Sequence, residues 1–166
     1  MFSRIYKLIL PIIIISSIIL TGCKNIEPID CPLTDLSWEI TEEELTASEG
    51  EALSTYDSIY GGTTYTYDSI YKEKNGTIKY MYDEEGVLMS IAWAYGSEDP
   101  DELMELYNLI HEELEETHGE SGYTANEETN YGDVWRLDEG HIIISVVLTD
   151  SNKALQVSYV SPLNEE

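Results

Sequence analysis

The apolar run near the start of the chain most constrains the fold, because it decides which residues remain to form a folded domain. Residues 8–20 are almost uninterrupted in their apolar character, and Arg4 and Lys7 precede them. The run is too short for a permanent bilayer span, which needs about 20 residues. A short apolar run between a basic start and small residues is typical of a cleavable secretory signal. We therefore expect residues 1–22 to be removed.

The residues that follow resemble the lipobox of bacterial lipoproteins: Leu20, Thr21 and Gly22 stand directly before Cys23. The resemblance implies that the Cys23 thiol receives a covalent diacylglyceryl lipid, with acyl chains such as palmitate, and that cleavage frees its amino group. Two acyl chains suffice for stable membrane attachment. We expect a domain anchored at the extracytoplasmic face of the cell membrane, or at an outer membrane in a two-membrane envelope. No other cofactor is expected.

The charge of the chain restricts its partners. The 166 residues carry 33 acidic and 8 basic side chains, and loss of residues 1–22 would leave 144 residues with a formal charge of −27. Nucleic-acid binding depends on basic residues that displace counterions, so we expect no nucleic-acid partner. Anionic lipid headgroups would repel the domain, so contact with the membrane is expected through the lipid anchor alone. Acidic residues on solvated faces also favour solubility.

The segment after the anchor predicts a tether. Residues 23–34 contain two prolines and show no periodicity, which is typical of a linker. The second cysteine, Cys31, falls within it, so no internal disulfide is expected, and an unpaired thiol in an exported chain is available for intermolecular pairing. Residues 35–166 then have the length of one α+β domain.

The stretch from residue 54 to residue 95 predicts three or four strands. Tyr, Thr and Ile dominate it, and these residues favour the half-buried surface of a sheet. Turn residues interrupt it at Gly61-Gly62, at Asn75-Gly76 and at residues 83–86. The last of these has the spacing of a four-residue hairpin loop. We expect antiparallel hairpins here.

Two helices are expected. Thr41 and Glu44 form a capping box for a short first helix. Asp99 is a suitable N-cap for a longer second helix, Pro100 suits its first position, and Gly119 is placed to end it. Five apolar residues of this second helix recur at helical spacing and form one stripe: Leu103, Leu106, Tyr107, Ile110 and Leu114.

Three further strands are expected after the second helix, at residues 134–137, 141–149 and 155–159. Residues 141–149 form a long, mainly apolar run, which is typical of a central strand covered on both faces or nearly so. The fold class predicted is α+β, with an antiparallel sheet of about six to seven strands and helices packed on one face. This element order over residues 36–161 resembles the tandem layout of beta-lactamase inhibitor proteins. One unit of it also resembles the small lipoprotein of the outer-membrane barrel-assembly machinery. No residue motif accompanies either resemblance.

The tyrosines are the best candidates for a binding site, since eight of the 13 lie between Tyr56 and Tyr95. Side chains two residues apart share one face of a strand. On the helix-covered face these tyrosines are core residues; on the open face they form an aromatic platform for a glycan or a protein. The candidate binding residues are Tyr65, Tyr67, Tyr71, Tyr80 and Tyr82.

Catalytic motifs are weak. His111 and Glu112 begin a near match to a zinc-protease helix motif, but the position of the second histidine is Glu115. His118 lies on the same helix face as His111 and Glu115, and this pattern is also typical of a solvated acidic helix with incidental histidines. We therefore expect a non-enzymatic binding or interaction module with no catalytic or metal residues. The alternatives are a cell-envelope hydrolase or metal-dependent enzyme, and an accessory subunit of an envelope complex or transporter.

Overall fold

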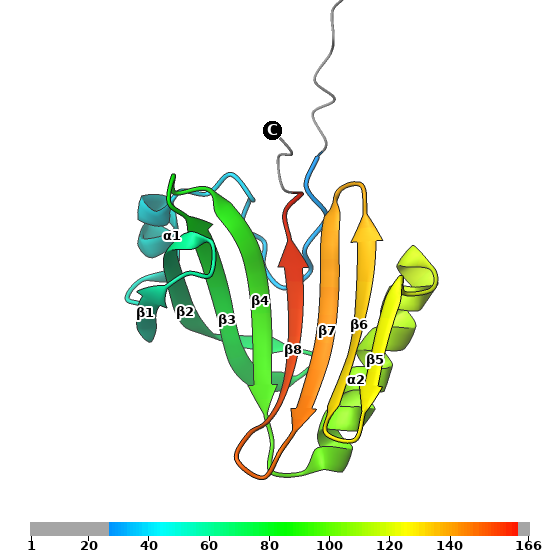
Figure 1. Ribbon diagram of the computed structural model, residues 1–166. Helices are drawn as coiled ribbons and strands as arrows, with labels where there is room; N and C mark the ends of the chain where they lie inside the picture. The colour runs from blue at the N-terminus through cyan, green and yellow to red at the C-terminus, as the bar shows by residue number, and fades with distance from the viewer. Residues whose placement is uncertain (1–26, 163–166) are drawn as a thin grey trace, which may run out of the picture.

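The structure is a computed structural model that describes residues 27–162, and it has an α+β fold (Figure 1). The predicted signal segment and Cys23 lie outside the described residues. In chain order the elements are α1 (Glu42–Glu49), β1 (Ser54–Asp57), β2 (Gly61–Tyr71), β3 (Lys74–Asp83), β4 (Leu88–Gly96), α2 (Pro100–His118), β5 (Tyr123–Glu127), β6 (Asn130–Leu137), β7 (Gly140–Leu148) and β8 (Lys153–Val160).

The eight strands form one antiparallel sheet in the order β1-β2-β3-β4-β8-β7-β6-β5. Each half of the described chain is a helix followed by four strands, and the two halves join where β4 pairs with β8. The expected count of six to seven strands was too low, because β5 was not predicted. This edge strand is mostly exposed, so it lacks the apolar alternation that marks a half-buried strand.

Both predicted helices are confirmed, together with their caps. The Thr41 side chain accepts a hydrogen bond from the backbone of Glu44, and the Glu44 carboxylate accepts one from the Thr41 amide. Asp99 caps α2, Pro100 stands at its start and Gly119 ends it. The predicted apolar stripe is the buried face of α2.

One predicted turn is wrong. Asn75-Gly76 lies inside β3, and the turn between β2 and β3 is made by Lys72 and Glu73, which have φ angles of 50° and 62°. Gly76 is needed for close packing: a Cβ atom there would lie 2.4 Å from the Ala94 carbonyl oxygen and 2.7 Å from the Trp93 ring. Gly76 therefore allows β3 to pack closely against β4, and it does not form a turn.

One face of the sheet is covered and holds the core. A row of side chains in register crosses six strands on this face, and it packs with the stripe of α2 and with Leu45 of α1. The row is Tyr65, Tyr80, Ile91, Tyr159, Ile142 and Trp135. The helices therefore cover one face, as predicted.

The N-terminal strap (residues 27–40) is part of the fold, contrary to the prediction that the tether extends to residue 34. Ile29, Cys31 and Leu33 are each less than 9% exposed and belong to the core. The Ile29 amide donates to the Glu139 carbonyl oxygen, and the Tyr80 hydroxyl donates to Thr34. Burial raises the pKa of the Cys31 thiol to about 12, which opposes its reactivity. Packing therefore begins at Ile29.

Candidate functional site

The candidate tyrosines lie on the covered face of the sheet. Tyr67, Tyr80 and Tyr82 are 4%, 1% and 0% exposed, so they are core residues and form no exposed platform. The Tyr82 hydroxyl donates to the Ile40 carbonyl oxygen. The hydroxyls of Tyr80 and Tyr82 reach the strap because alternate residues of β3 point toward the layer that covers the sheet, whereas the Tyr67 hydroxyl is buried without a hydrogen-bond partner.

Tyr65 and Tyr71 are half-buried at the margins of the same face. The Tyr65 hydroxyl donates to the Glu42 carboxylate at 2.5 Å, and this bond together with burial raises its pKa to about 12. Tyr71 packs edge-on against Trp93, and burial raises its pKa to about 12. Both tyrosines connect the sheet to its covering layer.

The open face, on the opposite side of the sheet, is the candidate functional surface. The helices and the strap pack on the other side of the sheet. The four central strands β3, β4, β8 and β7 each place four residues on the open face. These sixteen positions are Asn75, Thr77, Lys79 and Met81 on β3; Ser90, Ala92, Ala94 and Gly96 on β4; Ala154, Gln156, Ser158 and Val160 on β8; and His141, Ile143, Ser145 and Val147 on β7.

The composition of the open face differs from that of the whole chain. None of the sixteen positions is Asp or Glu, in a chain of 166 residues with 33 acids. Lys79 supplies a cation, and Ile143 and Val147 supply half-buried apolar surface. The β7 run was expected to be covered on both faces or nearly so; the structure covers one face, and the residues on the other are half-buried. Ser90, Ala92, Ser158 and Val160 are buried, and the other positions of this face are half-buried or exposed. Solubility favours charged residues on accessible faces, so the absence of acids from this one needs another reason.

The second notable cluster surrounds Asp133, a carboxylate on β6 that is 1% exposed beneath α2. Three hydroxyls donate to it: that of Tyr107, that of Ser121 at 2.9 Å and that of Thr124 at 2.5 Å. The Nδ1 atom of His111 lies 3.0 Å from its Oδ2 atom. The cluster joins α2 to the β5–β6 hairpin.

The chemistry of this cluster indicates a structural role, in which it holds α2 against the β5–β6 hairpin. Burial alone would raise the pKa of Asp133, but bonds from Thr124, Tyr107 and Ser121, with the nearby charge of His111, hold that pKa below its ordinary value. The Ser121 hydroxyl bonds to Asp133 itself and not to the free ring nitrogen of His111, which lies 3.4 Å from Glu115. A serine nucleophile needs that nitrogen as its base, so the arrangement is no catalytic triad.

Asp133→Asn should destabilise the protein by about 1–3 kcal/mol at pH 7, because hydrogen bonds to a buried charge are lost or weakened. The depressed pKa gives the sign of the pH dependence. Ionised Asp133 stabilises the fold above its unfolded-state pKa of about 4, and this contribution disappears as the pH falls through the lower folded-state value. Urea unfolding of both proteins between pH 7 and pH 3 measures it. Equal loss of stability in both proteins on acidification would contradict the assignment.

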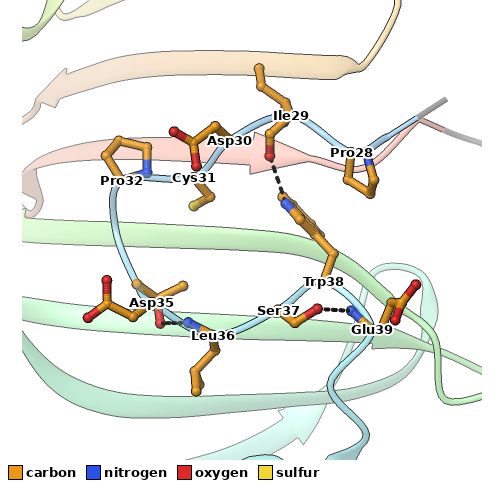
Figure 2. Close-up of a pocket in the computed structure, with 11 residues that line it drawn as sticks. Pro28, Ile29, Asp30, Cys31, Pro32, Asp35, Leu36, Ser37, Trp38 and Glu39 are labelled. Carbon is orange, nitrogen blue, oxygen red and sulfur yellow. Dashed lines mark hydrogen bonds between the residues drawn. The ribbon is translucent and has the colours of Figure 1, made fainter.

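A hollow of about 760 Å³ lies within the strap itself, and Figure 2 shows the two arms that surround it. The Trp38 indole N–H donates to the Ile29 carbonyl oxygen and joins these arms. Asp30, Asp35 and Glu39 are exposed around it. The hollow follows from the looped path of the strap.

A smaller groove of about 280 Å³ separates the strap from α2. Ile110, Leu114 and Tyr159 contribute apolar surface, and an ion pair between Lys72 and Glu113 lies beside them. Thr117 and His118 also line it, and the Thr117 hydroxyl donates to the Glu113 carbonyl oxygen. Within residues 27–162, moreover, His, Cys, Asp and Glu side chains form no group that is arranged to hold a metal ion.

Sequence reasoning missed both the open face and the Asp133 cluster. The signal for Asp133 was its place between Tyr131 and Trp135, where alternation puts an acid on the helix-facing side of β6. The signal for the open face was the absence of acids at alternate positions of β4, β7 and β8. In the part of the chain that the structure describes, no helix is long and apolar enough to cross a membrane.

Comparison of the chain with protein-family models, with curated proteins and with solved structures finds no match. The functional argument therefore depends on the residues and their geometry.

Proposed function

We propose that this protein is a membrane-tethered, extracytoplasmic lipoprotein that acts as a non-enzymatic binding module and uses its open face to hold a protein partner. The sequence supports the tether, through the short apolar run and the lipobox-like residues that end at Cys23. The observation that carries the binding role is the open face, where sixteen positions on four neighbouring strands include no acid.

Charge complementarity indicates the kind of partner. Acids predominate around the open face: Asp68 lies toward one margin on β2, Glu127 lies at the other on β5, and residues 83–85 lie at the β3–β4 turn. Arg136 on β6, beside His141, is an exposed basic residue of the same face. An acid-free centre within a mainly acidic rim fits a protein surface with an apolar centre and Lys or Arg around it. A second copy of this chain does not fit, because the two acidic rims would repel each other.

A protein fits the open face better than a glycan. Glycan binding was expected to use a continuous aromatic platform, but the candidate tyrosines lie on the covered face. The exposed tyrosines of the open face are Tyr56 and Tyr123, and they belong to β1 and β5, the two opposite edges of the sheet. An accessory subunit of an envelope complex would use the open face in the same way.

Photo-crosslinking in intact cells tests this proposal. The full-length protein would carry p-benzoylphenylalanine in place of Ile143 on the open face, or in place of Leu109 on the exposed side of α2 as the matched control. We expect a discrete protein adduct from position 143 and no such adduct from position 109. An absence of adducts at position 143, or the same adduct from both positions, would contradict the proposed use of the open face.

A further inference from the structure

The strap leaves only a short linker between the proposed lipid anchor and the fold. Ile29 is the first buried residue, and it lies six residues after Cys23. An extended chain spans at most about 3.3–3.6 Å per residue, so these six residues reach about 20 Å. The point where the strap enters the core is therefore within about 20 Å of the lipid attachment.

The strap enters the core at one end of the strands. Its Ile29 amide donates to Glu139 in the β6–β7 turn, and Figure 1 shows the chain arriving where β8 ends. The β3–β4 turn lies at this same end, because Ser90, near the start of β4, pairs with Val160 at the end of β8. β7 has nine residues and spans about 30 Å. No part of the open face is then farther than about 50 Å from the membrane.

The anchored end of the fold is also acidic. Asp83, Glu84 and Glu85 lie in its β3–β4 turn, and Asp138 and Glu139 lie in its β6–β7 turn. Anionic headgroups repel such an end, which opposes its burial in the membrane surface. With the proposed anchor, this short linker would hold the domain close to the bilayer while the charge of this end opposes contact with the headgroups.

We infer that the partner of the open face is itself fixed in the same membrane, and that the part it presents stands within about 50 Å of the bilayer. The inference rests on the proposed function and names its partner class. Two proteins confined to one surface meet at a raised effective concentration, and the gain depends on a linker that matches the height of the sites. A linker this short suits a neighbour in the membrane.

The experiment changes the linker and leaves the domain intact. Full-length protein with p-benzoylphenylalanine at position 143 would carry either a 20-residue Gly/Ser insertion after Lys24 or a two-residue Gly-Ser insertion as the matched control. We expect a several-fold loss of adduct with the long insertion, because effective concentration falls as a flexible linker lengthens. We also expect the partner identified from the control adduct to stay with the membrane when membranes from non-irradiated cells, where it carries no crosslink, are washed at alkaline pH.

The outcomes separate the two proposals. If the alkaline wash removes the identified partner from non-irradiated membranes, or if the two linker lengths give equal adduct yields, the membrane-fixed partner is overturned and the binding module stands. A failure to form any adduct from position 143 with either linker overturns the proposed function, and the inference with it.

Discussion

A chain that begins at Asp35 is expected to be largely unfolded at 25 °C, whereas a chain that begins at Glu27 folds. The shorter chain lacks Ile29, Cys31 and Leu33, which are buried in the core. Burial of an aliphatic side chain contributes about 1.5–3 kcal/mol, so Ile29 and Leu33 together contribute roughly 3–6 kcal/mol, and burial of Cys31 adds to this. The total stability of a domain is about 5–15 kcal/mol, so this loss removes much of it.

Circular dichroism and urea unfolding of the two chains measure this effect. Lost hydrogen bonds add to it, since the Tyr80 hydroxyl and the Trp38 indole lose their acceptors on Thr34 and Ile29. The single substitution Ile29→Ala in the longer chain tests one of these buried side chains, and we expect it to lower the free energy of unfolding by about 2–5 kcal/mol. Equal unfolding midpoints for the chains that begin at residues 27 and 35 would show that the strap is a tether after all.

The second large effect compares two neighbours on β3 that point to opposite faces. Tyr80→Ala is expected to lower the free energy of unfolding by about 3–5 kcal/mol, because it removes an aromatic ring that is 1% exposed. Lys79→Ala, its matched control on the open face, should change stability by less than about 0.5 kcal/mol. Thermal or urea unfolding of the two variants measures the difference. Similar losses in both would mean that the faces are wrongly assigned.

Local signals predicted the helices and most strands because each has a short-range physical cause. The capping residues Thr41 and Asp99 satisfy amides at the start of each helix, and the stripe of α2 needs only helical periodicity to be seen. The hairpin loop at residues 83–86 follows from its turn residues. Lys72 and Glu73 make a turn without glycine or asparagine, so sequence placed that turn at Asn75-Gly76 instead.

The functional surface was harder to predict, because the pairing and packing of segments far apart in the sequence decide which face of the sheet is covered. Alternation put Tyr65, Tyr67 and Tyr71 on one side of β2, but only the packing of the strap and α1 shows that this side is covered. The open face combines β3 and β4 with β7 and β8, which are far apart in sequence. The strap has no periodicity, so its burial depends on contacts that no local pattern records.

The central claim is that the acid-free open face is the binding surface, and negative charge placed on it is the most direct test. Thr77→Glu with Ser145→Glu puts two acids in one cross-strand row of the open face, while Asn108→Glu with Leu109→Glu adds the same charge on exposed α2. The measurement is the amount of the partner, identified beforehand by crosslinking from position 143, that co-purifies with each variant from detergent-solubilised membranes. We expect at least a tenfold loss for the open-face pair, about 1.4 kcal/mol, and none for the α2 pair. Undiminished recovery with a folded open-face variant would contradict the claim.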